Sequence, residues 1–180
     1  ISEPYIVSSY KSHNEMNSNN INDIYIDEEK RIWIANYPEG ITIIDNRYKS
    51  YNWIKHSIGN RQSLVNDQVH SVIEDSDGDL WFGTSNGISF YQSKTGQWHS
   101  FLSSFDHQLK NKNHIFITLC EVSPGIIWAG GYTSGVYKIN KRTLSVEYFS
   151  PYLLNPDNIR PDKYKYIRDI VKDSKGYIWS

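Results

Sequence analysis

The chain has 180 residues, which is enough for one domain with a hydrophobic core, and it carries 19 basic and 20 acidic residues. This balance leaves no basic excess for nucleic acid or for an anionic membrane surface, so we expect this chain to contact neither directly. Aromatic residues make up 14% of the sequence, and their abundance favours strands. Because the chain begins at Ile1 and not at methionine, we expect it to be part of a longer protein.

Four similar units follow one another along the chain, each marked by a tryptophan. The four residues are Trp33, Trp81, Trp128 and Trp179, at spacings of 48, 47 and 51 residues. After each of the first three, a small residue follows at the second position and a glycine with a β-branched partner follows at the sixth or seventh. Repetition at a fixed period of this length is typical of a repeat architecture.

The residues before and after each tryptophan also align. One apolar column contains Ile21, Val69, Phe116 and Ile167, and a second contains Ile24, Val72, Leu119 and Ile170. A small polar column between them contains Asp23, Ser71, Thr118 and Asp169. An aromatic residue closes each complete unit about 20 residues after its tryptophan, at Tyr51, Phe101 and Phe149. Each unit therefore predicts four short strands, which is the pattern of a β-propeller blade, with a solenoid as the alternative architecture.

The expected blades divide the chain as follows. Residues 1–13 include YIVSSY, which predicts the last strand of a preceding blade, and complete blades are expected at 20–53, 68–101 and 115–149. Residues 166–180 predict the first two strands of a further blade. The prediction is an all-β fragment of about 3.75 antiparallel blades, which is too few to close a propeller of four to eight blades. We therefore expect open blade edges that other blades of the parent chain cover.

The stretch DSDGDLWFGT contains three alternating aspartates, Asp75, Asp77 and Asp79. Such a pattern occurs in calcium loops, which supply six to eight oxygen ligands, and also in tight turns between strands. The equivalent stretches read DEEKR, VSPGI and DSKGY, and none of them keeps the alternating acids. A turn is therefore favoured over a metal site. We expect no metal and no cofactor.

The sequence lacks the motifs that would indicate an enzyme. We find no H-E-x-x-H, G-x-S-x-G, P-loop or paired-cysteine pattern. The one cysteine, Cys120, lies in an apolar run, which predicts a small buried side chain. We predict no catalytic residues, although a lyase or hydrolase site assembled across blades stays as a minor alternative.

DSDGDLWFGTSNGISFY resembles the two-component regulator propeller repeat, whose core reads D-x-x-G-x-[LI]-W-[IF]-G-T-x-x-G-[IL]. DSKGYIWS matches the first half of this motif, and SLVNDQVHSVIED resembles the segment that precedes it. Two other copies depart from the motif: DEEKRIWIANYPEGITIID lacks the turn glycine, and VSPGIIWAGGYTSGVYKIN lacks the aspartate. The resemblance extends over nearly the whole chain.

The resemblance implies a seven-bladed propeller in the extracytoplasmic, periplasmic part of an inner-membrane hybrid two-component sensor. In that family, tandem propellers precede a β-sandwich, a membrane span, histidine kinase and receiver modules and a DNA-binding output, and many members respond to oligosaccharides and control genes for polysaccharide use. By this resemblance the parent protein is a sensor histidine kinase that acts as a homodimer. A propeller that binds other proteins, without a small ligand, is the alternative function.

Polar positions that differ between the repeats are the candidate ligand-binding residues. One of them is the column beside the inner-strand apolar residues, and the others lie in loops that meet at one rim of a propeller. Aromatic faces and planar hydrogen-bonding groups in such loops suit a sugar, and basic groups suit an acidic sugar. The candidates are Asn22, Tyr37, Asn66, His70, His114, Tyr132, Arg160, Lys163 and Arg168. The long connections 54–67 and 150–165 exceed what joining two strands requires, and ordinary solvated loop is the alternative for each position.

Overall fold

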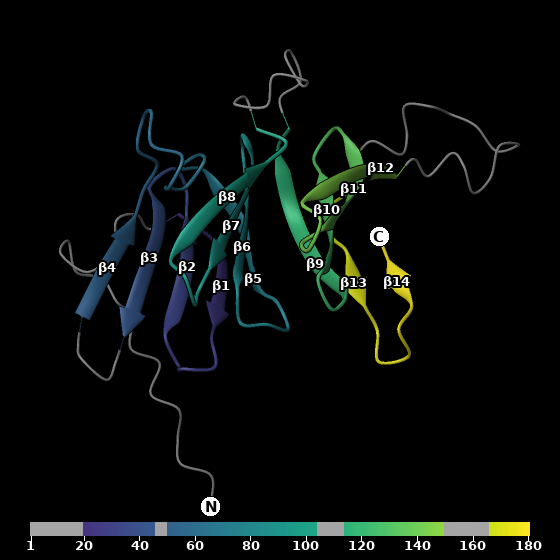
Figure 1. Ribbon diagram of the computed structural model, residues 1–180, viewed down its shortest axis with the longest axis horizontal. Helices are drawn as coiled ribbons and strands as arrows, with labels where there is room; N and C mark the ends of the chain where they lie inside the picture. Colours follow the sequence, from purple (N-terminus) through teal and green to yellow (C-terminus); the bar gives the residue numbers. More distant parts are fainter. Residues whose placement is uncertain (1–19, 46–49, 104–113, 150–165) are drawn as a thin grey trace, which may run out of the picture.

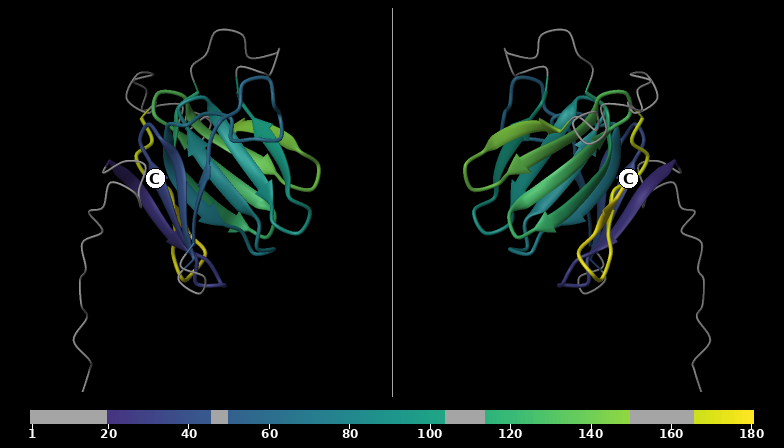
Figure 2. Two further views of the ribbon diagram at one scale, coloured as in Figure 1. Left: turned by 90° about the vertical axis from the view of Figure 1, so that its left-hand side faces the viewer. Right: turned by 90° about the vertical axis from the view of Figure 1, so that its right-hand side faces the viewer.

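The computed structural model describes residues 20–45, 50–103, 114–149 and 166–180, with the side chains of residues 50 and 51 excepted. Within these ranges the chain forms strands and turns and no helix, so the described part contains no helix long and apolar enough to cross a membrane. Three four-stranded antiparallel sheets and one hairpin stand side by side like the blades of a propeller (Figures 1 and 2). The prediction of an all-β propeller fragment is confirmed. The expected strand in residues 1–13 lies outside the described residues.

Within every sheet the strands are paired in chain order. The first sheet contains β1 (Ile21–Ile26), β2 (Ile32–Asn36), β3 (Gly40–Asp45) and β4 (Ser50–Ile54). The second contains β5 (Val69–Glu74), β6 (Leu80–Thr84), β7 (Gly87–Gln92) and β8 (Gln97–Phe101). The third contains β9 (Phe116–Ser123), β10 (Ile126–Gly131), β11 (Gly135–Asn140) and β12 (Ser145–Phe149). The C-terminal hairpin contains β13 (Val171–Lys172) and β14 (Ile178–Trp179).

The strand register agrees with the sequence columns in all but one place. Asp23, Ser71 and Thr118 pair with the small residues Ala35, Gly83 and Gly130. At the outer edge, however, Ile88 pairs with Phe101 and Val136 pairs with Phe149, whereas Ile41 pairs with Ile54. The closing residue of the first sheet is therefore Ile54. The expectation of Tyr51 was wrong, because Tyr51 pairs with Ile44, three positions further along β3.

A β-bulge interrupts the innermost strand of each complete sheet at the same position. The register shifts between Ile21 and Asp23, between Val69 and Ser71, and between Phe116 and Thr118. The extra residues are Asn22, His70 and Ile117, which are three members of the variable column in the sequence. A bulge leaves its extra residue out of the ladder and redirects its side chain. The variable column is therefore a column of bulge residues.

The sheets pack closely because the residue two positions after the tryptophan is small. A Cβ atom on Gly83 would lie 2.5 Å from Ser71 Oγ and 2.7 Å from the carbonyl oxygen of Phe116 on the third sheet. On Gly130 it would lie 2.5 Å from Ile167 Cγ2, next to the hairpin. Between the sheets lie aromatic and aliphatic side chains, including the fully buried Trp81 and Phe82. The small residue thus sets how close neighbouring sheets can approach.

The small polar column joins the inner strands of neighbouring sheets. Asp23 Oδ2 accepts a 2.9 Å hydrogen bond from the N–H of Val72 on β5. Thr118 Oγ1 accepts one of 3.2 Å from the N–H of Ile170 and donates one of 2.9 Å to Asp169 Oδ1. These side chains satisfy backbone donors that face the adjacent sheet, as buried backbone groups require.

In three of the four repeats, an aspartate holds both the turn and the tryptophan. Asp75 Oδ1 accepts hydrogen bonds of 3.0 and 3.1 Å from the N–H groups of Asp77 and Asp79, and Asp75 Oδ2 accepts one of 2.8 Å from Trp81 Nε1. The same indole contact joins Trp33 to Asp27 and Trp179 to Asp173. These hydrogen bonds explain why aspartate and tryptophan occur six residues apart.

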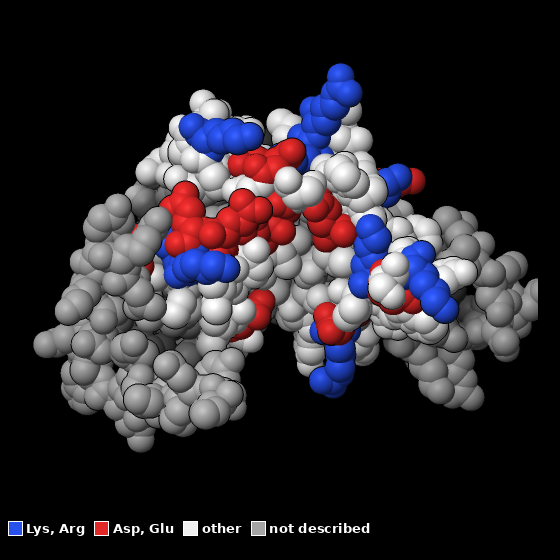
Figure 3. Space-filling model, turned by 90° about the horizontal axis from the view of Figure 1, so that it is seen from below, with Lys and Arg blue, Asp and Glu red and all other residues white. Residues whose placement is uncertain are grey.

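The three aspartates of DSDGDLWFGT surround a lysine. Nζ of Lys141, from the turn between β11 and β12, lies 2.8 Å from Asp75 Oδ2, 2.8 Å from Asp77 Oδ2 and 2.7 Å from Asp79 Oδ2. Acidic side chains gather on the face of the molecule where these turns lie (Figure 3). In the described part of the chain, no group of three acidic, histidine or cysteine side chains is arranged to hold a metal ion. The stretch is a turn whose negative charge is partly offset by one lysine of the neighbouring sheet.

Candidate functional site

A pocket of about 760 Å³ opens at the rim of the sheets, opposite the turns that carry the aspartates. We call it the rim pocket. Its lining comes from all three sheets and consists of Tyr37, Asn66, Gln68, His70, Ser85, Asn86, Ile115, Ile117 and Tyr132. The lining contains no lysine, arginine, aspartate or glutamate. Ligand pockets commonly have this size and this combination of flat aromatic surface with a few polar groups.

The β-bulges direct side chains toward this pocket. His70 and Ile117 are bulge residues of β5 and β9, and both line it. The remaining lining residues come from the loops that follow β2, β6 and β10 and from the segments that enter β5 and β9. The rim ends of three sheets are therefore needed to form one pocket.

Two hydrogen bonds determine the protonation of His70. The Asn22 amide nitrogen donates to the carbonyl oxygen of Val69 at 2.8 Å and lies 3.4 Å from His70 Nδ1. His70 Nδ1 then accepts, so Nε2 carries the proton and donates to Ser85 Oγ at 2.7 Å. Burial lowers the pKa of His70 and so favours the same neutral ring. Near neutral pH the pocket therefore carries no formal charge.

Aromatic rings lie on both sides of the pocket. Tyr37 is tilted toward His70, with ring centroids 6.0 Å apart. Tyr132 is 44% exposed, and Tyr166 packs edge to face against it with centroids 5.5 Å apart. These rings offer apolar faces next to amide and hydroxyl groups, an arrangement that can hold the C–H faces and the hydroxyl groups of a sugar.

The structure brings together some of the residues that the sequence predicts and separates others. Tyr37, Asn66, His70 and Tyr132 line the rim pocket, and Asn22 contacts His70 behind it. Arg168 is exposed and is not among the lining residues. Arg160 and Lys163 lie outside the described residues.

His114 has a different environment from the other candidates. Its side chain is only 1% exposed, stacks on Phe116 with a centroid separation of 6.1 Å and lies edge to face with Tyr137 at 5.6 Å. Its carbonyl oxygen accepts a hydrogen bond from the N–H of Gly87. In this arrangement His114 is a packing residue between the second and third sheets, and it does not line the rim pocket.

Sequence reasoning missed five lining residues. They are Gln68, Ser85, Asn86, Ile115 and Ile117. The loops gave a signal for the first three, because they contain polar residues that the other repeats do not share. Ile117 belongs to the variable column, but it was not chosen because it is apolar. Ile115 gave no signal, because an isoleucine at the start of an apolar strand predicts only packing.

Comparison with known proteins finds a family match in two segments of the chain. A family model described as "two component regulator propeller" matches residues 15–37, which include all of β1 and β2, and residues 63–86, which include all of β5 and β6. These two segments are similar to two component regulator propeller repeats. Among curated proteins, none matches this sequence.

Solved structures share the fold of these repeats. The extracellular domain of BT3049 from B. thetaiotaomicron, described as a hybrid two component system, is 21% identical, with a TM-score of 0.74 over 96% of this chain and 22% of that one. The extracellular domain of BT4673 from the same organism, described in the same way, is 20% identical, with a TM-score of 0.67 over 94% and 20%. An ancestral GH74 enzyme is 13% identical, with a TM-score of 0.58 over 86% and 20%. This chain thus spans about a fifth of the length of each of these proteins.

Proposed function

We propose that this chain is a ligand-binding segment of the extracytoplasmic, periplasmic sensor of a hybrid two-component regulator, and that its ligand is an uncharged oligosaccharide. The observation that carries the proposal is the composition of the rim pocket: aromatic rings, amides and hydroxyls from three sheets, with no charged side chain. The regulator propeller repeats and the likeness to two extracellular domains of hybrid systems support the sensor role.

The pocket can bind a sugar without reacting with it. The neutral His70 ring and Ser85 are held in fixed orientation by their mutual hydrogen bond and by Asn22. The amides and hydroxyls that line the pocket both donate and accept, which suits the vicinal hydroxyl groups of a pyranose. A strongly anionic sugar would lose its hydration here without gaining a cationic partner, which disfavours it.

In this proposal, binding passes a signal by a shift between two arrangements of the sensor dimer. A ligand shifts such an equilibrium only as far as its affinities for the two arrangements differ. Because the pocket contains loops from all three sheets, an occupied pocket favours the arrangement in which their rim ends are closest. The kinase that receives the signal is expected elsewhere in the parent protein.

Titration of the whole protein with a panel of neutral hexasaccharides (cellohexaose, maltohexaose, xylohexaose, mannohexaose) and a heparin hexasaccharide tests the proposal. We expect saturable binding of one neutral member without turnover, and a loss of at least about tenfold in affinity in Tyr132→Ala. Ile58→Ala, at a residue that is 94% exposed and does not line the pocket, is the control. Affinity should also fall at acid pH as His70 gains a proton, and burial places this loss at a lower pH than for an ordinary histidine because it lowers the pKa of His70. Turnover of a sugar, or binding that Tyr132→Ala leaves unchanged, would contradict the proposal.

A further inference from the structure

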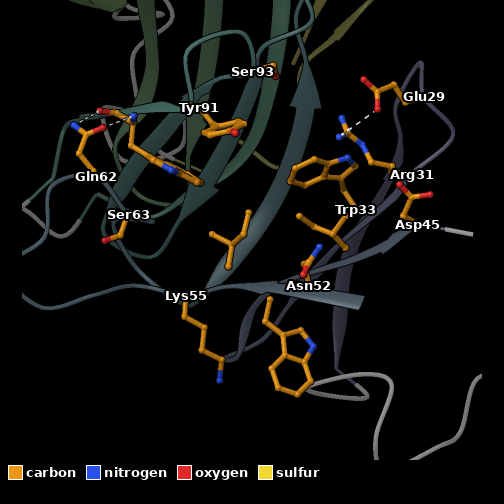
Figure 4. Close-up of a pocket in the computed structure, with 15 residues that line it drawn as sticks. Glu29, Arg31, Trp33, Asp45, Asn52, Lys55, Gln62, Ser63, Tyr91 and Ser93 are labelled. Carbon is orange, nitrogen blue, oxygen red and sulfur yellow. Dashed lines mark hydrogen bonds and ion pairs between the residues drawn. The ribbon is translucent and has the colours of Figure 1, made fainter. Parts of the chain in front are cut away.

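A cavity of about 630 Å³ between the outer strands of the first and second sheets is a product of packing. Trp33 and Trp98, which line it, are 3% and 9% exposed, so their ring faces are covered. Gln62 fixes the connection between β4 and β5 beside it, by hydrogen bonds of 3.3 Å to the carbonyl oxygen and 2.9 Å from the N–H of Trp98 (Figure 4). We assign no ligand to this cavity.

The rim pocket, in contrast, contains a gap where a side chain of the repeat is small. Tyr37, Ser85 and Tyr132 each lie four residues after the tryptophan of their repeat. The N–H group of each donates a hydrogen bond of 2.8 to 3.0 Å to the carbonyl oxygen of the residue that precedes the inner strand of its own sheet. The three positions are therefore structurally equivalent. Because the middle sheet has a serine where its two neighbours have a tyrosine, the space of a phenol ring is left open at the rim.

The gap at Ser85 faces the third sheet. In the preceding pair of sheets, the equivalent Tyr37 lies with its ring centroid 6.0 Å from that of His70, the bulge residue of the following sheet. By the same repeat, Ser85 faces Ile117, the bulge residue of the third sheet. Ser85 and Ile117 both line the rim pocket. The space that a tyrosine would fill therefore lies between these two residues.

Two isoleucines make this side of the gap apolar. Ile117 stands where the first two sheets carry Asn22 and His70. Ile115 also lines the pocket, at the position before the inner strand where the first two sheets carry an asparagine and a glutamine. Both isoleucines are half-buried. A sugar hydroxyl group placed against them would lose its hydration without gaining a hydrogen bond, whereas a methyl group would gain from burial there.

Ser85 provides a hydrogen-bond donor beside this apolar side. Its Oγ accepts from His70 Nε2 at 2.7 Å, because Asn22 holds the ring with Nδ1 as the acceptor. In the part of the chain that the structure describes, no protein acceptor takes the hydroxyl proton of Ser85. This proton is left for a ligand, and an oxygen that only accepts, such as a carbonyl oxygen, suits it best.

We propose that the sugar bound at the rim carries an acetamido group, as N-acetylhexosamines do, and that this group occupies the gap at Ser85. The inference rests on the proposed function and narrows its ligand. The acetamido methyl group packs on Ile115 and Ile117, its carbonyl oxygen accepts the Ser85 proton, and its N–H donates to the side-chain amide oxygen of Gln68. A deoxy sugar such as fucose or rhamnose also brings a methyl group, but it has no carbonyl oxygen for the serine.

The first experiment compares matched ligands on the whole protein. Chitohexaose and cellohexaose share a backbone of linked glucose units and differ in the acetamido group that replaces one hydroxyl group of each unit. N-acetylgalactosamine and galactose form a second pair. We expect the acetylated member of at least one pair to bind at least about tenfold more tightly than its partner. Saturation-transfer NMR should show the strongest transfer to its acetamido methyl group, and neither fucose nor rhamnose should compete at equal concentration.

The second experiment locates the acetamido group with two variants. Ser85→Tyr introduces the residue that the first and third sheets carry, so the fold should accept it, and the added ring should abolish the preference for the acetylated sugar. Ile117→Asn introduces the residue of the first sheet at this bulge and should reduce the preference at least about fourfold, as expected when one methyl group loses its apolar contact. Ile58→Asn, at a residue that is 94% exposed and does not line the pocket, is the control. Thermal denaturation checks that each variant is folded.

This inference and the proposed function can fail separately. The inference is overturned if neither acetylated sugar binds more tightly than its partner, if fucose or rhamnose competes, or if a folded Ser85→Tyr keeps the preference. If Ser85→Tyr does not fold, a preference that Ile117→Asn leaves unchanged overturns it. In each of these cases, binding of an unacetylated oligosaccharide that Tyr132→Ala weakens leaves the rim proposal standing. If no sugar of either kind binds, the proposed function fails and the inference fails with it.

Discussion

Lys141 shows how one residue can decide the meaning of a motif from a distant part of the chain. Its partial burial opposes the charged form, but hydrogen bonds to Asp75, Asp77 and Asp79 outweigh this and raise the pKa of Lys141. The lysine hydrogen bond in turn lowers the pKa of Asp77. Asp75 and Asp79 are buried on folding, so their charges need a partner within the protein. The ammonium group supplies it from the third sheet.

Lys141→Met should therefore destabilise the protein by about 3 kcal/mol, because it leaves buried carboxylates without a counter-charge. Lys138→Met is the matched control, because Lys138 is 44% exposed and pairs 3.5 Å from an exposed Glu147. That change should cost less than about 1 kcal/mol. Thermal denaturation at pH 7 measures both. Equal melting temperatures for the two variants would show that the cluster around Lys141 contributes nothing to stability.

At the scale of the sheet, the repeat was predictable where packing fixes the residue type. The apolar columns, the tryptophan and the small residue after it all occupy positions where neighbouring sheets leave room for one kind of side chain. The candidate site was predictable only in part. The sequence indicated Asn22 and His70 because the residue type at their position differs from repeat to repeat. The residue types alone do not show that a β-bulge lies at this position. A bulge adds one residue to a strand, and the alternation of inward and outward residues in the sequence does not reveal which residue is the extra one.

The error at Tyr51 has a related physical cause. Tyr51 is aromatic, as the closing residues Phe101 and Phe149 are. However, Tyr51 lies 18 residues after Trp33, whereas Phe101 and Phe149 lie 20 and 21 residues after the tryptophans of their own repeats. Backbone pairing identifies Ile54, 21 residues after Trp33, as the equivalent residue. Ile54 packs against the same cluster as Trp33. Packing at this column requires an apolar side chain, and either an aliphatic or an aromatic one satisfies it.

The close approach of the sheets gives a prediction at this scale. Gly83→Ala places a Cβ 2.5 Å from Ser71 Oγ and 2.7 Å from a backbone oxygen of the third sheet. The backbone cannot move aside as a flexible side chain does, so we expect Gly83→Ala to lower the free energy of unfolding by about 3 kcal/mol. At Gly96, with φ of 72° and open space around it, alanine meets no neighbour, and only its positive φ costs about 1 kcal/mol. Chemical denaturation should rank the two variants in this order, and the reverse order would mean that the sheets separate without cost.

At the scale of the whole molecule, the two ends of the row of sheets differ from its interior. Tyr25 on β1 reaches the second sheet, where its hydroxyl donates to Glu74 Oε2 at 2.8 Å. Its neighbours Ile24 and Ile26 alternate to the opposite face and are 54% and 56% exposed. At the far end, Tyr177 and Trp179 of the hairpin are 64% and 63% exposed. Apolar surface of this kind in a sheet normally packs against another layer.

These ends predict how residues 20–180 behave when they are produced alone. The unpaired faces should associate, so sedimentation velocity should show oligomers whose proportion rises with protein concentration. Ile24→Thr with Ile26→Thr should raise the monomer fraction, because both changes keep a β-branched side chain and remove apolar area from one end. Val146→Thr, at a less exposed position on β12, is the control and should change it less. A segment that stays monomeric at every concentration would contradict the expectation that further blades cover these faces.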